Sequence, residues 1–232
     1  MQNFFIEGIK MSLLDVVGPV MVGPSSSHTL GAMRIAKFVN RMIGMVPKKV
    51  EFLLHGSFAE TFRGHGTDRA LLAGILGLRY DDEKIRAIYE IVDKVGLSYQ
   101  FSKANLGDVH PNTVCVKVEA GDYHHEIEGC SVGGGAIRIT KINGIDCNLT
   151  WAYDTLIIIN KDEQGALSKI LSNLGANIAN LYLRRINLLV GRALTIIELD
   201  SPVNVFNLSK NPFVVEYYFI PRDDTVQDFL GG

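Results

Sequence analysis

Cysteine is scarce in this sequence, and no two cysteines stand close together. Cys115, Cys130 and Cys147 are the only three in 232 residues, and no C-x-x-C pair occurs. An odd number of well separated cysteines argues against a disulfide framework and against a zinc or iron–sulfur site built from this chain alone. We therefore interpret all three as buried structural thiols, and we expect no metal site in the chain.

Clusters of one charge and long apolar runs are also missing. The formal net charge is −2 and no run of lysine and arginine exceeds two residues, so the electrostatic footprint of a nucleic-acid-binding protein is absent. No apolar stretch is long enough to cross a membrane, and the first ten residues lack the layout of a signal peptide. We expect a soluble, cytoplasmic protein that binds neither nucleic acid nor membrane.

The chain does contain enough apolar sequence to build a core. Hydrophobic residues make up 47% of it and charged residues 21%, which is typical of globular proteins and excludes disordered and fibrous classes. A length of 232 residues suffices for one large domain or two small ones.

Chemistry is densest in residues 16–29, VVGPVMVGPSSSHT. Each of the two Gly-Pro pairs interrupts helical structure, so a helix can begin only after Pro24. Apolar residues then recur at helical spacing, which predicts a helix with its N-cap among Ser25 to Ser27. Its first N–H groups, four hydroxyls and the imidazole of His28 would face a small carboxylate or phosphate. The alternative is an ordinary helix start, which needs only one such hydroxyl.

More polar residues follow the next predicted elements. A strand over 49–54 ends on His55-Gly56-Ser57, and the end of a strand is where α/β folds place ligand groups. The turn 62–67 has His65 at its centre, and Thr67 is predicted to cap a helix over 67–78. A surface histidine is the alternative for His65.

The remainder of the first half is predicted from periodicity and turn residues. His124 and His125 are neighbours on a strand and point to opposite faces, so we expect them to be surface residues and not parts of one site. The glycine loop 131–135 lets a backbone approach a ligand closely but lacks the features of a nucleotide-binding loop. The elements are an amphipathic helix over 80–96, strands over 97–102, 113–120 and 123–131, and two strands from 136 to about 151.

From residue 154 the pattern changes to strand, helix, strand, strand, short helix and strand. This is the ferredoxin-like βαββαβ order, an α+β arrangement. An open four-stranded sheet leaves edges that a second copy could cover. The predicted segments are strand 155–160, helix 166–175, strands 181–186 and 194–200, short helix 204–209 and strand 214–220.

Five motifs, in order, resemble those of the β subunit of bacterial iron–sulfur L-serine dehydratase. In that family, the resemblance implies, L-serine is deaminated to pyruvate and ammonia without pyridoxal phosphate. A [4Fe–4S] cluster acts as the Lewis acid, and its cysteines lie on a separate α polypeptide in two-subunit members. A chain ending at residue 232 is similar to such a separate β subunit. The motifs are residues 12–29, HGSFA at 55–59, GHGTDRA at 64–70, HPNT at 110–113 and SVGGG at 131–135.

The resemblance also implies roles for individual residues. His28, Ser27 and Thr29 are expected to be catalytic, with the Ser25–Thr29 cluster at the carboxylate of L-serine and His28 as an anchor or proton carrier. The residues expected to bind substrate are Ser25, Ser26, His55, Ser57, His65, Thr67, His110, Asn112, Gly133 and Gly134.

Two domains are implied in the same way. Residues 1–151 resemble the mixed-sheet allosteric substrate-binding domain of some 3-phosphoglycerate dehydrogenases. Residues 152–232 resemble an ACT domain, which commonly self-associates and binds small amino acids, here through Gly165, Asn177 and Asn180. Gln164 stands where that pattern often has proline, so dimerisation without a ligand is the alternative. Two rival functions stay open: a regulatory module that binds serine or another small anion, and a dimerising scaffold.

Overall fold

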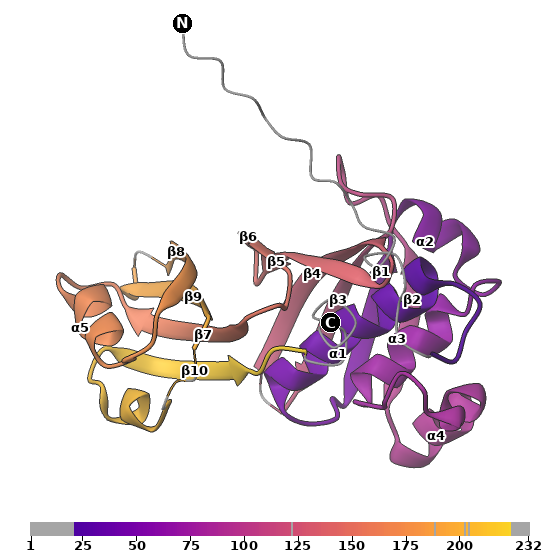
Figure 1. The fold of residues 1–232 in the computed structure, drawn as a ribbon, viewed down its shortest axis with the longest axis horizontal. Helices are drawn as coiled ribbons and strands as arrows, with labels where there is room; N and C mark the ends of the chain where they lie inside the picture. Colours follow the sequence, from indigo (N-terminus) through magenta and orange to yellow (C-terminus); the bar gives the residue numbers. More distant parts are fainter. Residues whose placement is uncertain (1–20, 122, 188, 202, 204, 224–232) are drawn as a thin grey trace, which may run out of the picture.

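The computed structural model of the chain describes residues 21–121, 123–187, 189–201, 203 and 205–223. Two β-sheets lie next to each other along the long axis of the molecule (Figure 1). The first Gly-Pro pair, at 18–19, lies outside the described residues, as do residues 12–20 of the first motif. No helix of the described part is long and apolar enough to cross a membrane.

Six strands form the first sheet: β1 (Lys49–Leu54), β2 (Ser98–Lys103), β3 (Thr113–Ala120), β4 (Tyr123–Gly133), β5 (Ala136–Ile142) and β6 (Ile145–Leu149). Their order in space is β2-β1-β3-β4-β5-β6. β1 and β2 run parallel, whereas the other neighbours are antiparallel. A parallel pair needs a long crossover connection, and the helical segment between β1 and β2 provides it.

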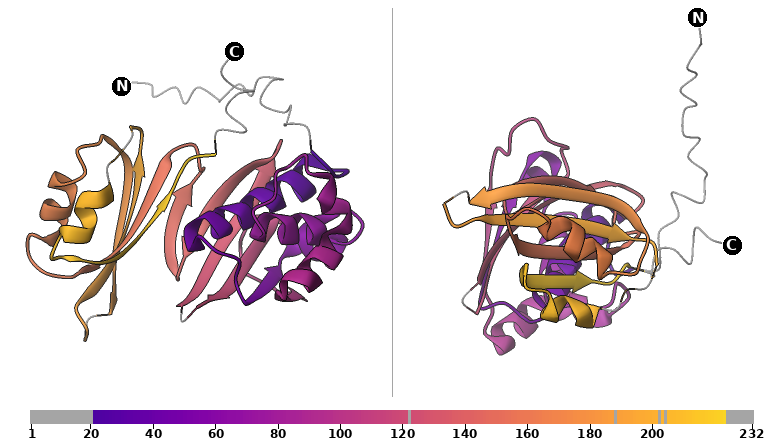
Figure 2. Two further views of the ribbon diagram at one scale, coloured as in Figure 1. Left: turned by 90° about the horizontal axis from the view of Figure 1, so that it is seen from below. Right: turned by 90° about the vertical axis from the view of Figure 1, so that its left-hand side faces the viewer.

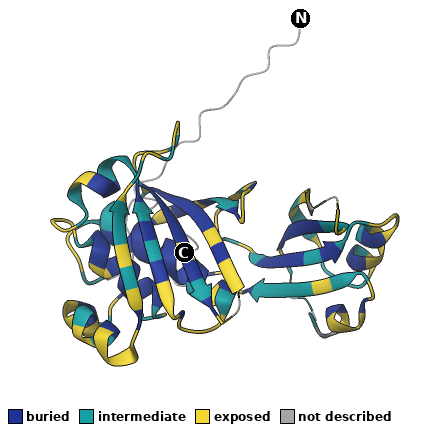
Figure 3. Ribbon diagram, turned by 180° about the vertical axis from the view of Figure 1, so that it is seen from behind, coloured by how far each residue is buried: buried dark blue, intermediate teal, exposed yellow. Residues whose placement is uncertain are grey.

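Helices cover one face of this sheet, and no described helix covers the other (Figure 3). The inward side chains of β1, which are Val50, Phe52 and Leu54, are completely buried beneath the helices. The helices are η2 (Ser26–Gly31), α1 (Ala32–Ile43), α2 (Gly56–Thr61), α3 (Thr67–Ile75), η3 (Glu83–Ala87) and α4 (Ile88–Val95).

The second sheet has four strands, all neighbours antiparallel, in the order β10-β7-β9-β8. They are β7 (Asp154–Lys161), β8 (Ile178–Asn187), β9 (Arg192–Leu199) and β10 (Val214–Ile220). α5 (Ala166–Ser172) and η4 (Val205–Lys210) lie on one face (Figure 2). The opposite face packs against the first unit, because Ile157, Ile196 and Ile220 belong to the hydrophobic cluster that also contains α1. β9 is therefore buried on both faces.

A buried ion pair also crosses the seam, the contact between the second sheet and the first unit. Arg34 Nε on α1 lies 3.0 Å from Asp223 Oδ2, and both side chains are 5% exposed. The hydroxyl of Tyr80 donates to the same Asp223 oxygen, and Trp151 Nε1 donates to the carbonyl oxygen of Pro221 at 2.8 Å. The two units thus share one hydrophobic cluster, and the second unit has another of its own. The division into 1–151 and 152–232 stays a prediction.

The strands predicted over 49–54 and 113–120 are confirmed as β1 and β3. The helix predicted over 80–96 is shorter, because it begins as the tight 3-10 turn η3 before α4. The predicted Thr67 cap is wrong: Gly66, with a left-handed φ of 69°, occupies the cap position. The surface position expected for His125 is also wrong, because Tyr218 of the second sheet packs on it with ring centroids 5.3 Å apart.

Candidate functional site

The imidazole of His28 lies near the start of the continuous helix formed by η2 and α1, between two serine hydroxyls. Its Nε2 is 2.9 Å from Ser57 Oγ, and its Nδ1 is 3.5 Å from Ser25 Oγ. Ser25 is also the N-cap, since its hydroxyl accepts a hydrogen bond from the backbone N–H of His28 at 3.2 Å. The cap predicted among Ser25 to Ser27 is therefore confirmed at Ser25.

The first turn of this helix, Ser26–Gly31, is a π-helical turn that the sequence did not predict. Such turns are rare and are frequently found at functional sites. Ser26 and Ser27 are only half-buried in it, so the turn is open to solvent. Because N–H groups and the positive end of the dipole meet at a helix start, this turn can receive a small carboxylate.

Two rings enclose His28. The ring of His65 lies edge-to-face at a centroid distance of 4.7 Å, and the ring of Phe58 lies at 5.5 Å. Thr29 holds this arrangement in place, because its buried hydroxyl donates to the carbonyl oxygen of His65 at 3.0 Å. Burial lowers the pKa of His28, and the neighbouring His65 lowers it further. The imidazole is therefore neutral at pH 7 and able to accept a proton.

The turn 110–112 packs against the start of α2, next to Ser57. A Cβ at Gly56 would lie 2.7 Å from the carbonyl oxygen of Pro111, so the close approach and the φ of 51° both require glycine. Asn112 Oδ1 is buried and has no hydrogen-bond partner among the described residues. A buried acceptor without a partner commonly marks the place of a water or a ligand, which makes Asn112 a candidate for substrate binding.

Two of the histidines predicted to bind substrate accept hydrogen bonds from backbone N–H groups. Nδ1 of His55 accepts a hydrogen bond from the backbone N–H of Leu106 at 3.2 Å. Nδ1 of His110 accepts one from the backbone N–H of Asn112 at 3.1 Å, and its ring is exposed. These bonds organise the turns around α2, and neither ring contacts His28 in the way that His65 does.

Three other predicted substrate-binding residues do not join the cluster. Unlike the half-buried Asn112, Thr67 has no exposed surface, so we assign it no contact with a ligand even though its hydroxyl has no partner in the described part of the chain. Gly133 and Gly134 form a half-buried turn. The contact with η2 is made instead by Gly135, where a Cβ would lie 2.4 Å from the Leu30 side chain.

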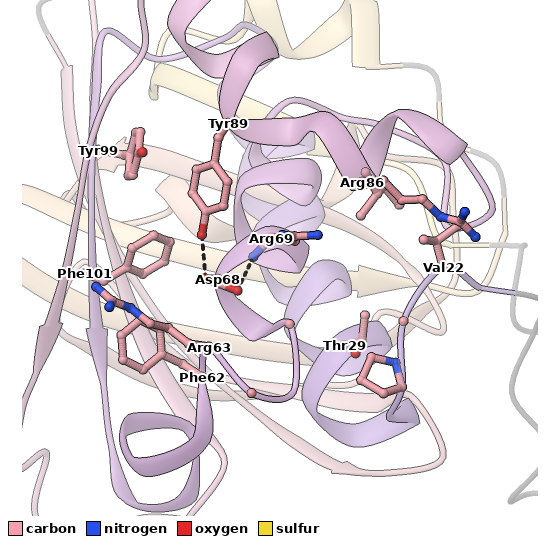
Figure 4. Close-up of a pocket in the computed structure, with 15 residues that line it drawn as sticks. Val22, Thr29, Phe62, Arg63, Asp68, Arg69, Arg86, Tyr89, Tyr99 and Phe101 are labelled. Atoms are coloured by element: carbon pink, nitrogen blue, oxygen red, sulfur yellow. Dashed lines mark hydrogen bonds between the residues drawn. The ribbon is translucent and has the colours of Figure 1, made fainter.

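A cavity of about 710 Å³ lies beside the His28 cluster (Figure 4). Thr29 and residues of the turn 62–66 line it, and it is distinct from the cluster because the rings of His28 and His65 do not. Three guanidinium groups stand around it, and aromatic rings form a wall. The lining residues are Val22, Gly23, Pro24, Thr29, Phe62, Arg63, Gly64, Gly66, Asp68, Arg69, Ile85, Arg86, Tyr89, Tyr99 and Phe101.

The arginines of this cavity are functional candidates that our sequence reasoning missed. Arg63 and Arg69 flank His65 in the string RGHGTDR, of which only His65 and Thr67 were predicted to be site residues. Arg86 lies on η3, seventeen residues further on. Two positive charges around a glycine-rich turn were the sequence signal for Arg63 and Arg69. Arg86 gave no such signal, because only the fold brings it to the cavity.

In the second unit, the two asparagines predicted to bind an effector already form hydrogen bonds within the chain. Gly165 takes a left-handed φ of 84° as the N-cap of α5. Asn177 Nδ2 donates to Asp200 Oδ2 at 2.6 Å, and Asn180 Nδ2 donates to Glu198 Oε2 at 2.7 Å. Burial raises the pKa of Glu198. These amides therefore hold β8 against the end of β9.

The three thiols do not fit a metal cluster. Cys115 and Cys130 are buried, Cys147 is half-buried, and all three are free. Burial raises the pKa of Cys115 and of Cys147 to about 12 and also raises that of Cys130, which disfavours the thiolate that a metal needs. Within the described ranges, no group of three or more histidine, cysteine and acidic residues is placed to hold a metal ion.

Comparison with known proteins bears on what this geometry is for. A family model described as serine dehydratase beta chain matches residues 12–106. A protein of Peptoniphilus asaccharolyticus named "L-serine dehydratase, beta chain" is 42% identical over 197 residues, which cover 83% of this chain and 88% of that protein. The chain belongs to the serine dehydratase beta-chain family. The relative in Bacillus subtilis named "Probable L-serine dehydratase, beta chain" is 34% identical over 212 residues, 88% of this chain and 96% of that protein.

A longer relative matches this chain over only part of its own length. The Helicobacter pylori protein named "L-serine dehydratase" is 28% identical over 171 residues, which cover 62% of this chain but 37% of that protein. The family match over 12–106 contains His28, Ser57, His65 and the three cavity arginines, and it excludes Asn112 and the second sheet. The His28 cluster and the cavity therefore both lie in the segment that defines the family.

Proposed function

We propose that this chain is the β subunit of an L-serine dehydratase, an L-serine ammonia-lyase that deaminates L-serine to pyruvate and ammonia together with a separate α chain. The observation that carries the proposal is the cluster of Ser25, His28, Ser57 and His65, which lies at an open helix start within the family segment. This chain would bind and orient the substrate, and the partner would complete the site.

The start of η2 suits the carboxylate of L-serine. Hydroxyls of Ser25, Ser26 and Ser27 and the first N–H groups of the helix offer several donors to one anion. Fixing a substrate in a reactive orientation can lower the barrier by several kcal/mol, on the order of 7 in favourable cases. The carboxylate would thus be held beside a neutral imidazole.

His28 is the candidate proton carrier. Its pKa is lowered by burial and by His65, so at neutral pH it is an acceptor, and its Nε2 is oriented by the Ser57 hydroxyl at 2.9 Å. Ser27 shares the first turn with it. Thr29, predicted as catalytic, acts in this scheme through its bond to the His65 carbonyl oxygen, as a positioning residue.

We further propose that the [4Fe–4S] cluster implied by the resemblance is held by the α chain. The thiols of this chain are dispersed and stay protonated, which supports a ligand set outside it. The Helicobacter pylori relative, of which the match covers 37%, is long enough to hold both parts in one chain.

Residues 152–232 are proposed to be an ACT domain that mediates self-association. The strand order β10-β7-β9-β8 with α5 on one face supports this. β8 is an edge strand on which Leu183 and Ile186 are each 44% exposed, and an exposed edge favours pairing with a second copy. Effector binding would involve Gly165, Asn177 and Asn180, after release of the two amides from their carboxylates.

Anaerobic reconstitution tests the proposed function. The chain is co-produced with its α partner, and pyruvate formation from L-serine is compared with that of each chain alone. We expect pyruvate only when both chains are present, and a second polypeptide that carries iron and sulfide in the complex. Full activity of the α chain alone, or no complex and no pyruvate from the pair, would contradict the proposal.

A further inference from the structure

The cavity beside the His28 cluster is positively charged. Arg63, Arg69 and Arg86 contribute three guanidinium groups, and Asp68 contributes the one carboxylate of the lining, which leaves a net formal charge of +2. Asp68 is 7% exposed and already engaged: it accepts hydrogen bonds from the backbone N–H of Arg69 and from the Tyr89 hydroxyl. The charge facing the cavity is therefore that of the arginines.

These arginines have capacity for a ligand. Arg63 lies over the ring of Phe62 at 5.5 Å and Arg69 over that of Tyr89 at 6.0 Å, and the described residues contain no ion pair for either. A guanidinium stacked on a ring keeps its N–H groups free for an oxyanion. The ion pair of Arg86 with Glu83 is 71% exposed on both sides, so it is weak and easily exchanged.

One wall of the cavity is aromatic, with neighbouring ring planes inclined to each other by 39° and 63°. Tyr89, Tyr99 and Phe101 follow one another there, with ring centroids 6.1 and 5.9 Å apart. The bond to Asp68 fixes the Tyr89 ring, as Figure 4 shows. Burial and Asp68 raise the pKa of Tyr89, so the wall stays uncharged. Cavities of 300–1,000 Å³ with aromatic walls and a few charged groups are typical small-molecule sites, as a rule of thumb for roughly drug-sized ligands.

We propose that this cavity binds a small molecule that carries a doubly charged phosphate group on a flat ring. The ring would pack against the aromatic wall of Tyr89, Tyr99 and Phe101, and the phosphate would pair with arginine side chains of the lining. Arginine pairs with phosphate through two parallel N–H···O bonds. The site goes beyond the proposed function: it takes a ligand other than L-serine, at residues outside the His28 cluster.

Binding in this cavity can affect the His28 cluster, because the two sites are adjacent. The two share Thr29 and the turn 62–66, whose His65 faces His28 on one side while Arg63, Gly64 and Gly66 face the cavity on the other. Occupancy of the cavity would hold that turn in place, without occupying the substrate site.

Phenyl phosphate and inorganic phosphate are the probes, titrated calorimetrically into the purified chain. We expect phenyl phosphate to bind, and to bind more tightly than inorganic phosphate. The double substitution Arg69→Ala and Arg86→Ala should weaken binding at least tenfold, whereas Arg41→Ala, an exposed arginine on α1 outside the cavity, should leave it unchanged. His28→Ala should also leave it unchanged, which separates this site from the proposed substrate site. Thermal melts of each variant check the fold.

A second substitution tests the aromatic wall. Tyr99→Leu should remove the advantage of phenyl phosphate over inorganic phosphate and leave inorganic phosphate binding as it was. Absence of binding, or binding that the arginine pair does not affect, overturns the proposal. A third result also overturns it: the chain does not bind phenyl phosphate, but substitution of Arg69 and Arg86 by glutamate abolishes binding of the α partner. The cavity would then be a docking surface for an acidic protein segment.

Discussion

The protonation of His28 depends on two features of its surroundings, partial burial and a second histidine 4.7 Å away between ring centroids. Both disfavour the imidazolium, and burial is the larger cause. The unfolded chain therefore binds a proton at His28 more readily than the folded chain. Its contribution to stability is present above the ordinary histidine pKa of 6.5 and is lost as the pH falls below that value.

An NMR titration of the imidazole resonances tests this account of His28. We expect its pKa to lie below 6.5 and to move upward in a His65→Asn variant, without reaching 6.5 because burial persists. A His28 pKa above 6.5, or one that ignores the loss of His65, would show that the two rings do not interact as described.

Thr67 provides a second test at the scale of one residue. Its hydroxyl is buried without a partner in the described structure, and a buried hydroxyl without a hydrogen bond costs about 1–3 kcal/mol. Thr67→Val should therefore raise the free energy of unfolding, by about 1 kcal/mol. Urea unfolding measures it.

The matched control for Thr67 is Thr113→Val. Thr113 is equally buried, but its hydroxyl donates to the carbonyl oxygen of His110 at 2.6 Å. Its replacement should lower the free energy of unfolding by about 1 kcal/mol. Destabilisation by Thr67→Val as large as that of Thr113→Val would indicate a hidden partner or ligand at Thr67.

Among the elements, the close crossing of α1 and α3 does most to fix the site, because α1 continues η2 and α3 follows the turn that carries His65. Gly74 permits this crossing: a Cβ there would lie 2.3 Å from the carbonyl oxygen of Met33 and 2.8 Å from Ala36 Cβ. Backbone and side chain both obstruct it, so neither can yield without shifting a helix.

Gly74→Ala is therefore expected to destabilise the protein by about 1–3 kcal/mol, the usual cost of overpacking a core. Gly64→Ala is the matched control, since the nearest atom to its Cβ, Thr61 O, is 3.7 Å away and its φ is not positive. Thermal and urea unfolding compare the two. Equal stability of both variants would show that α1 and α3 pack less closely than described.

At this scale, local pattern predicted some elements and missed others for physical reasons. The local pattern of Lys49–Leu54 and Thr113–Ala120 predicted β1 and β3. Burial alternates along β1, but along β3 it alternates only in the second half. The π turn Ser26–Gly31 and the 3-10 turn Glu83–Ala87 escaped prediction. Each has a local side-chain cap, Ser25 for η2 and Asp82 for η3, but apolar periodicity does not distinguish these turns from an α-helix.

Across the whole molecule, the packing of the second sheet against the first unit is the feature that could not be predicted from the sequence. Periodicity indicated two successive patterns, but nothing in it placed Asp223 against Arg34, 189 residues apart. The same holds for the site: the string SSSHT pointed to an anion, whereas the pairing of His28 with Ser57 and His65 and the gathering of three arginines follow from the fold.

The Arg34–Asp223 pair is expected to matter for stability more than any surface pair. Asp223→Ala leaves a buried guanidinium without its carboxylate, and breaking a buried pair in this way costs about 3–5 kcal/mol. The matched control is Glu119→Ala, whose pair with Lys49 is 44–52% exposed and contributes at most about 1 kcal/mol. Similar unfolding curves for the two variants would contradict the seam described above.

The central claim is that the His28 cluster of this chain forms part of the substrate site of a two-chain serine dehydratase. The measurement that tests it most directly is kcat/KM for L-serine in the reconstituted complex carrying His28→Ala, with His124→Ala as the control. A proton carrier typically contributes about 10²–10⁴-fold. We predict a loss of at least about a hundredfold for His28→Ala with the complex intact, and no change for His124→Ala. A His28→Ala complex that turns over L-serine at the rate of the unmodified enzyme would contradict the account.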